Sequence, residues 1–191
     1  FNSGFVGVSE AITHEVGHTL LLAHDGTSTA SYYTGHDSAD TPGWAPIMGV
    51  GYYQPVSQWS QQEYFDANNN GNDANFGYGR DDIAIISSLT NGNNFGLKSD
   101  DHGDAQADAT AITQVSSRFD GIIETRQDLD VFSFTTATTG VASFTASVAA
   151  IGPNLDIEIS LKDSSGSVVA SANTTAALDA SISTTIAPGA Y

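Results

Sequence analysis

The sequence HEVGHTLLLAHD, residues 14–25, decides how this chain is interpreted. It contains the pattern HExxH, which places His14 and His18 four residues apart and therefore on one face of a helix. Two imidazoles in this arrangement can bind one zinc ion. Glu15 follows His14 directly, so its carboxylate lies beside such an ion, where it can deprotonate a zinc-bound water. The pattern predicts a zinc site that prepares water for attack on a peptide carbonyl.

A third histidine stands where a third ligand is needed. His24 follows His18 by six residues, and a chain that leaves its helix and turns back can bring it to the same ion. A catalytic zinc ion takes three protein ligands and keeps one position open, whereas structural sites are closed by four, often cysteines. The chain has no cysteine, so a structural site is disfavoured. His36 and His102 stand alone beside aspartates and are expected to be solvated.

The spacing is similar to HExxHxxGxxH, the signature of the metzincin zinc proteases, and Asp25 makes the chain look most like the reprolysin or adamalysin branch. The resemblance implies that the three histidines of residues 14–25 bind zinc and that Glu15 is the general base. The chain departs from the signature at Leu21, where the family has a glycine in a left-handed turn. That conformation costs a residue with a side chain roughly 1–2 kcal/mol.

A second segment supports this resemblance. Residues 45–49, Ala-Pro-Ile-Met-Gly, resemble the Met-turn that lies beneath the zinc ion in metzincins, which gives Met48 that position here. Taken alone, a single methionine more often fills a gap in a core. Some metzincins have a tyrosine two residues after this methionine. Here that position is Val50, and neither Tyr52 nor Tyr53, which follow, is assigned a catalytic role.

The composition excludes several classes of partner. The 191 residues include 22 Asp and Glu against 5 Lys and Arg, a formal net charge of -17. Such a surface repels phosphate backbones and anionic membranes, so neither nucleic acid nor a membrane is an expected partner. The chain begins with Phe1 and shows no signal peptide. We therefore expect a fragment of a secreted, extracellular protein whose signal peptide lies upstream.

Two domains are expected, 1–98 and 99–191, because a turn-rich stretch at 91–94 leads into the acidic residues 100–104. The first is interpreted as the helical C-terminal portion of a metzincin-like catalytic domain. Ser9 can cap the helix that carries the zinc motif, and Ser60 with Glu63 forms a capping box. The three expected helices cover residues 9–22, 60–68 and 81–89.

The second domain shows the alternation of half-buried strands. The expected strands cover residues 129–134, 142–148, 155–161 and 181–186, with a turn at 163–166. Together with the sequences at 100–104 and 128–134, this pattern resembles a bacterial pre-peptidase C-terminal domain. The resemblance implies an antiparallel β-sandwich, truncated here, that follows a secreted protease and aids secretion or binds substrate. The expected fold class is α+β.

Two acidic stretches leave calcium open as a second cation. Asp66, Asn68 and Asn70 match oxygen donors of an EF-hand loop, but position twelve would be Gly77 where that loop has glutamate. The acidic residues 100–104 are a second candidate for a calcium site. The alternatives are ordinary turns and a solvated linker.

These observations predict a zinc-dependent endopeptidase that acts on protein or peptide substrates. An alternative is a non-catalytic secretion or substrate-binding fragment, because metzincins build their cleft from a sheet that precedes the zinc helix. Only 13 residues precede His14 here. Zinc binding together with cleavage of a generic protein separates these two hypotheses.

Overall fold

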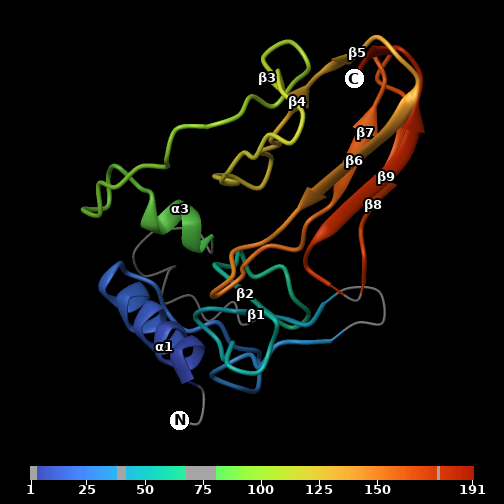
Figure 1. Ribbon diagram of the computed structural model, residues 1–191. Coiled ribbons are helices and arrows are strands. Elements are labelled where there is room, and N and C mark those ends of the chain that lie inside the picture. The colour runs from blue at the N-terminus through green and yellow to red at the C-terminus, as the bar shows by residue number, and fades with distance from the viewer. Residues whose placement is uncertain (1–3, 38–41, 68–80, 176) are drawn as a thin grey trace. The chain divides into compact units, whose positions relative to one another are not determined.

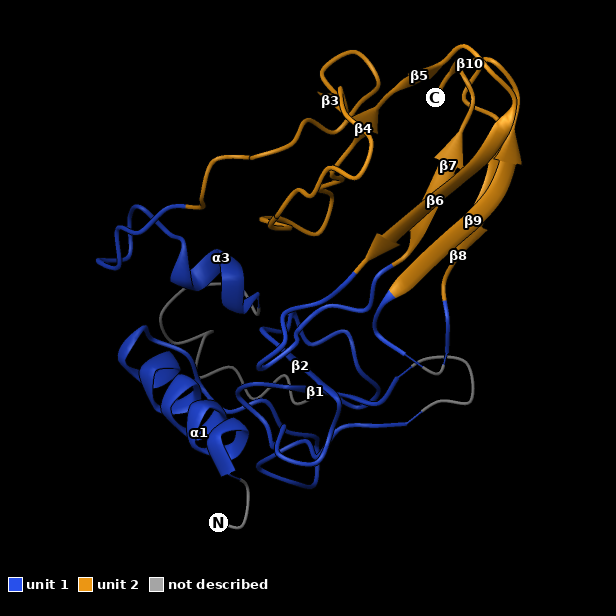
Figure 2. Ribbon diagram, viewed as in Figure 1, with its two compact units in different colours: residues 1–96, 147–157, 174–179 blue, residues 97–146, 158–173, 180–191 orange. Residues whose placement is uncertain are grey.

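The computed structural model describes residues 4–37, 42–67, 81–175 and 177–191. It divides into two compact units, one of residues 1–96, 147–157 and 174–179 and one of residues 97–146, 158–173 and 180–191 (Figure 2). Two segments from the second half of the chain thus group with the first unit. Among the described residues, no helix is both long and apolar enough to cross a membrane.

The first unit contains the helix with the zinc motif, α1, Gly4–Thr19 (Figure 1). The predicted start at Ser9 is wrong, because Ser9 lies inside the helix, where its carbonyl accepts a hydrogen bond from Thr13 Oγ1 at 2.8 Å. The predicted end at Leu22 is also wrong. The Leu22 amide donates to the Gly17 carbonyl at 3.1 Å and the Leu21 amide to the His18 carbonyl at 3.2 Å. This pair of bonds is a Schellman motif, which ends a helix.

The other elements of this unit are short. A parallel pair joins β1, Trp44–Pro46, to β2, Val56–Gln58. The predicted helix over 81–89 is present in shorter form as α3, Asp82–Ile86, capped by the Asp81 carboxylate, which accepts from the Ala84 amide at 3.2 Å. Asn93 lies beyond it and donates through Nδ2 to the Leu20 carbonyl at 3.0 Å, which ties this segment to the end of α1.

The predicted helix over 60–68 is wrong for its described part, since residues 60–67 form no helix. The side chains of its expected capping box have other partners. Glu63 accepts from the Gln61 amide at 2.7 Å, and the Ser60 hydroxyl donates to Asp25 at 2.7 Å. A backbone φ of 63° at Gln62 also interrupts a right-handed helix.

The second unit is built from short strands. They are β3 Thr110–Ala111, β4 Phe132–Ser133, β5 Thr135–Thr136, β6 Gly140–Ala146, β7 Ile159–Lys162, β8 Val168–Ala172, β9 Ala180–Ile186 and β10 Gly189–Ala190. The pairs β6–β9, β7–β8 and β5–β10 are antiparallel, and β3–β4 is parallel. Leu161, Ile182 and Ile186 form the core, against which Phe134 and Phe144 pack.

The alternating pattern located four of these strands, β4, β6, β7 and β9, with shifted bounds, and missed the other four, β3, β5, β8 and β10. The run over 155–161 becomes a strand only from Ile159, and the run over 129–134 only from Phe132. The turn at 163–166 is confirmed, because the Gly166 amide donates to the Asp163 carbonyl at 2.9 Å and Gly166 has a φ of 83°. The described residues thus combine helices with small, mostly antiparallel sheets, and the β-sandwich stays a prediction.

Candidate metal centre

Three histidines meet at the end of α1. His14 and His18 come from successive turns of the helix, and His24 follows the turn that ends it. The ring centroids are 4.9 Å apart for His14 and His18, 5.3 Å for His14 and His24, and 4.7 Å for His18 and His24. One nitrogen from each ring lies within 4.8 Å of the others, so the group could hold a metal ion. The structure therefore brings together the three histidines that the spacing singled out.

Backbone carbonyls fix which ring nitrogens are available. His14 Nδ1 lies 2.8 Å from the Ile47 carbonyl, and His18 Nδ1 lies 2.9 Å from the Leu22 carbonyl. A carbonyl only accepts hydrogen bonds, so both Nδ1 atoms carry a proton, and in the neutral ring Nε2 is then the nitrogen with a lone pair. His18 Nε2 lies 3.0 Å from His24 Nε2. Metal-binding histidines are commonly oriented in this way by a carbonyl behind the ring.

The surroundings of His24 favour its neutral form. Burial lowers the pKa of His24 below its usual range, and the neighbouring His18 and His14 lower it further, while Glu15 acts in the opposite direction. A neutral imidazole is the form that binds a metal ion. The His24 ring is thus held, chiefly by burial, in the form that can bind a cation.

A left-handed residue brings His24 to the group. Leu21 has a φ of 75°, which confirms that the chain turns at the position where the metzincin signature has glycine. Leu21 is half-buried and packs against the core of Leu22, Met48 and Ile85. Burial of an aliphatic side chain contributes roughly 1.5–3 kcal/mol, which is comparable to the backbone cost. The packing of Leu21 therefore offsets its strained conformation.

We expect Leu21→Gly to keep or raise the affinity for zinc, because glycine adopts the left-handed conformation without strain. The loss of the Leu21 side chain from the core lowers the free energy of unfolding instead. Zinc affinity, measured by calorimetry, therefore reports the backbone effect more directly. Leu20→Gly is the matched control, since Leu20 has no positive φ and gains nothing from glycine. A clear fall in affinity for Leu21→Gly, with His24→Ala leaving affinity unchanged, excludes His24 as a ligand.

Met48 packs against α1 at Gly17. Its side chain is fully buried, and its carbonyl accepts a hydrogen bond from the Asp25 amide at 2.9 Å. The methionine lies so close to Gly17 that a Cβ there would be 2.5 Å from Met48 Sδ and 3.2 Å from a ring carbon of Trp59. The preceding residue, Ile47, supplies the carbonyl behind His14. This segment thus supports both the helix and one ring of the group.

We expect Gly17→Ala to lower the free energy of unfolding, although alanine favours helices by about 1 kcal/mol over glycine. The added methyl group must displace Met48 from a packed core, and such overpacking costs typically 1–3 kcal/mol. Thermal unfolding measures the net loss. Gly140→Ala is the control, because a Cβ at Gly140 meets no atom within 4 Å. An unchanged melting temperature for Gly17→Ala would show that Met48 does not constrain α1.

Asp25 anchors the segment that follows His24. It is 2% exposed, and its Oδ2 accepts from the Ser60 hydroxyl at 2.7 Å. Its carbonyl accepts from the Tyr33 amide at 2.7 Å. Burial, followed by the charges of Asp25 and Asp82, raises the pKa of Tyr64, whose hydroxyl donates to the Gly26 carbonyl at 2.8 Å. Asp25, on which the resemblance to the reprolysin branch rests, thus holds the chain that follows His24 in place.

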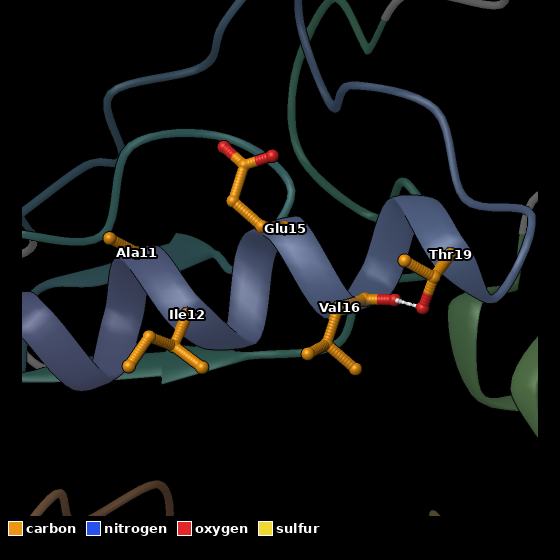
Figure 3. A pocket seen from close by; sticks show the side chains of 5 residues that line it. All are labelled: Ala11, Ile12, Glu15, Val16 and Thr19. Carbon is orange, nitrogen blue, oxygen red and sulfur yellow. Dashed lines mark hydrogen bonds between the residues drawn. The ribbon is translucent and has the colours of Figure 1, made fainter.

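Glu15 projects from the exposed side of α1. Figure 3 shows its carboxylate directed away from Val16, with which it lines a shallow hollow together with Ala11, Ile12 and Thr19. The charge of Glu15 partly opposes the lowering of the His24 pKa. Burial and then Glu10 raise the pKa of Tyr52, and Glu15 raises it further. The Glu15 carboxylate is therefore within electrostatic range of His24.

Sequence reasoning missed Tyr32. Its ring centroid lies 4.3 Å from that of His24 and 6.2 Å from that of His14. It is 42% exposed, so one side of the ring faces solvent. No sequence signal marks Tyr32, because the contact depends on the path of the loop after Asp25. The charge of Glu15 also acts on Tyr52, and Tyr53 is 85% exposed.

The remaining histidines lie outside this group. His36 Nδ1 is 2.9 Å from the Tyr33 hydroxyl. His102 is part-buried rather than solvated, with Nδ1 2.8 Å from Thr110 Oγ1 and Nε2 3.1 Å from the Asp120 carbonyl. The expectation that His102 is solvated is therefore wrong.

The calcium alternative at residues 66–77 falls mostly outside the described residues. Asp66 is described and accepts from the Ser28 hydroxyl at 2.7 Å, whereas Asn68, Asn70, Gly71 and Gly77 are not. In the acidic stretch, Asp101 Oδ1 accepts from the Ile122 amide at 3.4 Å and Asp104 Oδ1 from the Leu129 amide at 2.8 Å. These two aspartates accept hydrogen bonds from backbone amides of another loop. Calcium at 66–77 stays a prediction.

Comparisons with known proteins add no relative. No protein-family model matches the chain, and neither a curated protein nor a solved structure matches it.

Proposed function

We propose that this protein is a zinc-dependent endopeptidase that hydrolyses peptide bonds with Glu15 as general base. The observation that carries the proposal is the convergence of His14, His18 and His24, whose ligand nitrogens lie within 4.8 Å of one another. Two of the rings are oriented by carbonyls so that Nε2 is the free nitrogen. The metzincin family, the pre-peptidase C-terminal domain and an extracellular location belong to the same proposal.

The donor set fits zinc among the biological metals. Imidazole nitrogens suit zinc, and three protein ligands are the number that a catalytic zinc site uses. When bound, zinc polarises a carbonyl oxygen and lowers the pKa of water. Calcium and magnesium prefer oxygen ligands and do not fit this group.

The protein's own residues transfer the proton and orient the histidine rings. The Glu15 carboxylate takes the proton from the attacking water and passes it to the departing amine. Tyr32 shields one face of the His24 ring. The Ile47 carbonyl, in the segment of Met48, orients the His14 ring.

A second candidate is a module that binds zinc and protein without catalysis. The observation that favours it is the apolar surface beside Glu15, where Ile12 is 59% and Val16 is 45% exposed. Such a surface suits contact with another protein segment.

One experiment separates the two candidates. The purified protein is loaded with zinc and incubated with casein, with and without a chelator. We expect cleavage that the chelator abolishes and added zinc restores. Stoichiometric zinc binding without cleavage would leave the binding module, and absence of zinc binding would refute both.

A further inference from the structure

The three rings of the histidine group are not held in the same way. Backbone carbonyls accept hydrogen bonds from Nδ1 of His14, at 2.8 Å, and from Nδ1 of His18, at 2.9 Å. In the part of the chain that the structure describes, the one hydrogen-bonding neighbour of the His24 ring is His18 Nε2, 3.0 Å from His24 Nε2. A histidine that binds a metal ion usually has a group behind its ring that fixes the orientation. For His24, this group is not a carbonyl.

The ring of Tyr32 lies against His24 instead. The two ring centroids are 4.3 Å apart, and the ring planes are tilted by 38°. The centroid of His14 is farther from that of Tyr32, at 6.2 Å. At the shorter distance two rings are in direct contact, whereas the longer one lies towards the far end of the range of aromatic pairs, roughly 4.5–7 Å. Tyr32 therefore acts mainly on His24.

The next residue, Tyr33, holds Tyr32 in this place. The Tyr33 amide donates to the Asp25 carbonyl at 2.7 Å, and the Tyr33 carbonyl accepts from the Val50 amide at 2.8 Å. The Tyr33 ring stacks on that of Tyr64, with centroids 4.2 Å apart and planes 8° from parallel. Both the backbone and the ring of Tyr33 are thus fixed, which leaves its neighbour little freedom to move away from the histidine group.

The contacts of Tyr32 are those of its ring. Its hydroxyl group forms no hydrogen bond within the described ranges of the chain, and the residue is 42% exposed. We propose that Tyr32 is a positioning residue that sets the orientation of the His24 ring, as backbone carbonyls do for the other two histidines. This inference rests on the proposed zinc site. A ring that is oriented before the ion arrives loses less freedom on binding, so the contact raises the affinity for zinc.

NMR of the metal-free protein tests the positioning itself. The ring centroids of His18 and His24 are 4.7 Å apart, so their ring protons should give a nuclear Overhauser effect. We expect this effect to persist in Tyr32→Phe, which keeps the aromatic ring, and to weaken in Tyr32→Leu, which keeps an apolar side chain without it. The effect between His14 and His18, whose centroids are 4.9 Å apart, is the internal control and should not change, because carbonyls hold both rings.

Zinc titration by calorimetry measures the consequence. Tyr32→Leu should weaken zinc binding about tenfold, the lower end of the roughly 10–100-fold loss typical of removing a group that orients a metal ligand. Tyr32→Phe should retain the affinity of the parent protein. Tyr53→Leu is the matched control, because Tyr53 is 85% exposed and its ring lies against Tyr52 rather than against a histidine. If circular dichroism shows that Tyr32→Leu does not fold, Tyr32→Met takes its place.

The outcomes distinguish this inference from the proposed function. Either an unchanged effect between His18 and His24 or an unchanged zinc affinity in Tyr32→Leu would overturn the positioning role and leave the zinc site in place. Equal losses of affinity in Tyr32→Phe and Tyr32→Leu would assign the effect to the hydroxyl group and overturn the role of the ring. If the parent protein binds no zinc, the proposed function fails, and the NMR comparison alone decides the role of Tyr32.

Discussion

Glu15→Gln should leave zinc bound and lower the turnover of casein by roughly 10²–10⁴, the loss typical of removing a general base. Glutamine keeps the size of the side chain and the helix, but it does not accept the proton of water. The three histidines do not change, so the zinc content measured on the purified variant should equal that of the parent. The charge of Glu15 acts on His24, and His18 Nε2 lies 3.0 Å from His24 Nε2, so the proposal gives the carboxylate and the imidazoles separate roles.

Glu158→Gln is the control for this variant. Glu158 is an exposed carboxylate of the second unit, so its loss changes the net charge by the same amount without touching α1. Near-normal activity of Glu15→Gln, with zinc bound, would disprove the mechanism. Lost activity together with lost zinc would instead assign Glu15 to metal binding.

His18→Ala should abolish stoichiometric zinc binding and, with it, activity. The substitution removes a ligand nitrogen and also the hydrogen bond from Nδ1 to the Leu22 carbonyl, which closes the end of α1. The loss of affinity should exceed the roughly 10–100-fold typical of removing a hydrogen-bond partner of a ligand. The free energy of unfolding of His18→Ala should also no longer rise when zinc is added. In the parent protein this rise is about 2.7 kcal/mol when free zinc is 100 times its dissociation constant.

His36→Ala is the control, because His36 pairs with the Tyr33 hydroxyl and lies outside the group. Metal analysis after dialysis and thermal unfolding with and without zinc measure both effects. If His18→Ala retained one zinc ion per chain, the group would not be the zinc site.

The zinc motif could be predicted because helix geometry alone determines it. A spacing of four residues puts His14 and His18 on one face of α1, and the glycine position of the metzincin signature marked the turn that Leu21 makes. Contacts that depend on loops could not be predicted in this way. Tyr32 reaches His24 only because Asp25 and Tyr33 fix the path of the intervening chain.

The incorrect predictions have a common physical origin. Ser60 and Glu63 fit a capping box by spacing, but the buried Asp25 takes the Ser60 hydroxyl, and local sequence carries no information about Asp25. The acidic stretch at 100–104 gives no information about Glu124 and Asp128, whose carboxylates lie near that of Asp100 although they come from another loop. In each case the deciding partner is distant in sequence.

The end of α1 is normally where a helix frays, but here it is held from three directions. The Schellman bonds close it, His18 Nδ1 bonds to the Leu22 carbonyl, and Asn93 donates to the Leu20 carbonyl from 73 residues away. Ordering one residue costs roughly 1–2 kcal/mol of conformational entropy. That cost is met when the chain folds, so an ion that arrives at His18 and His24 finds a preorganised site and retains more of its interaction energy as affinity.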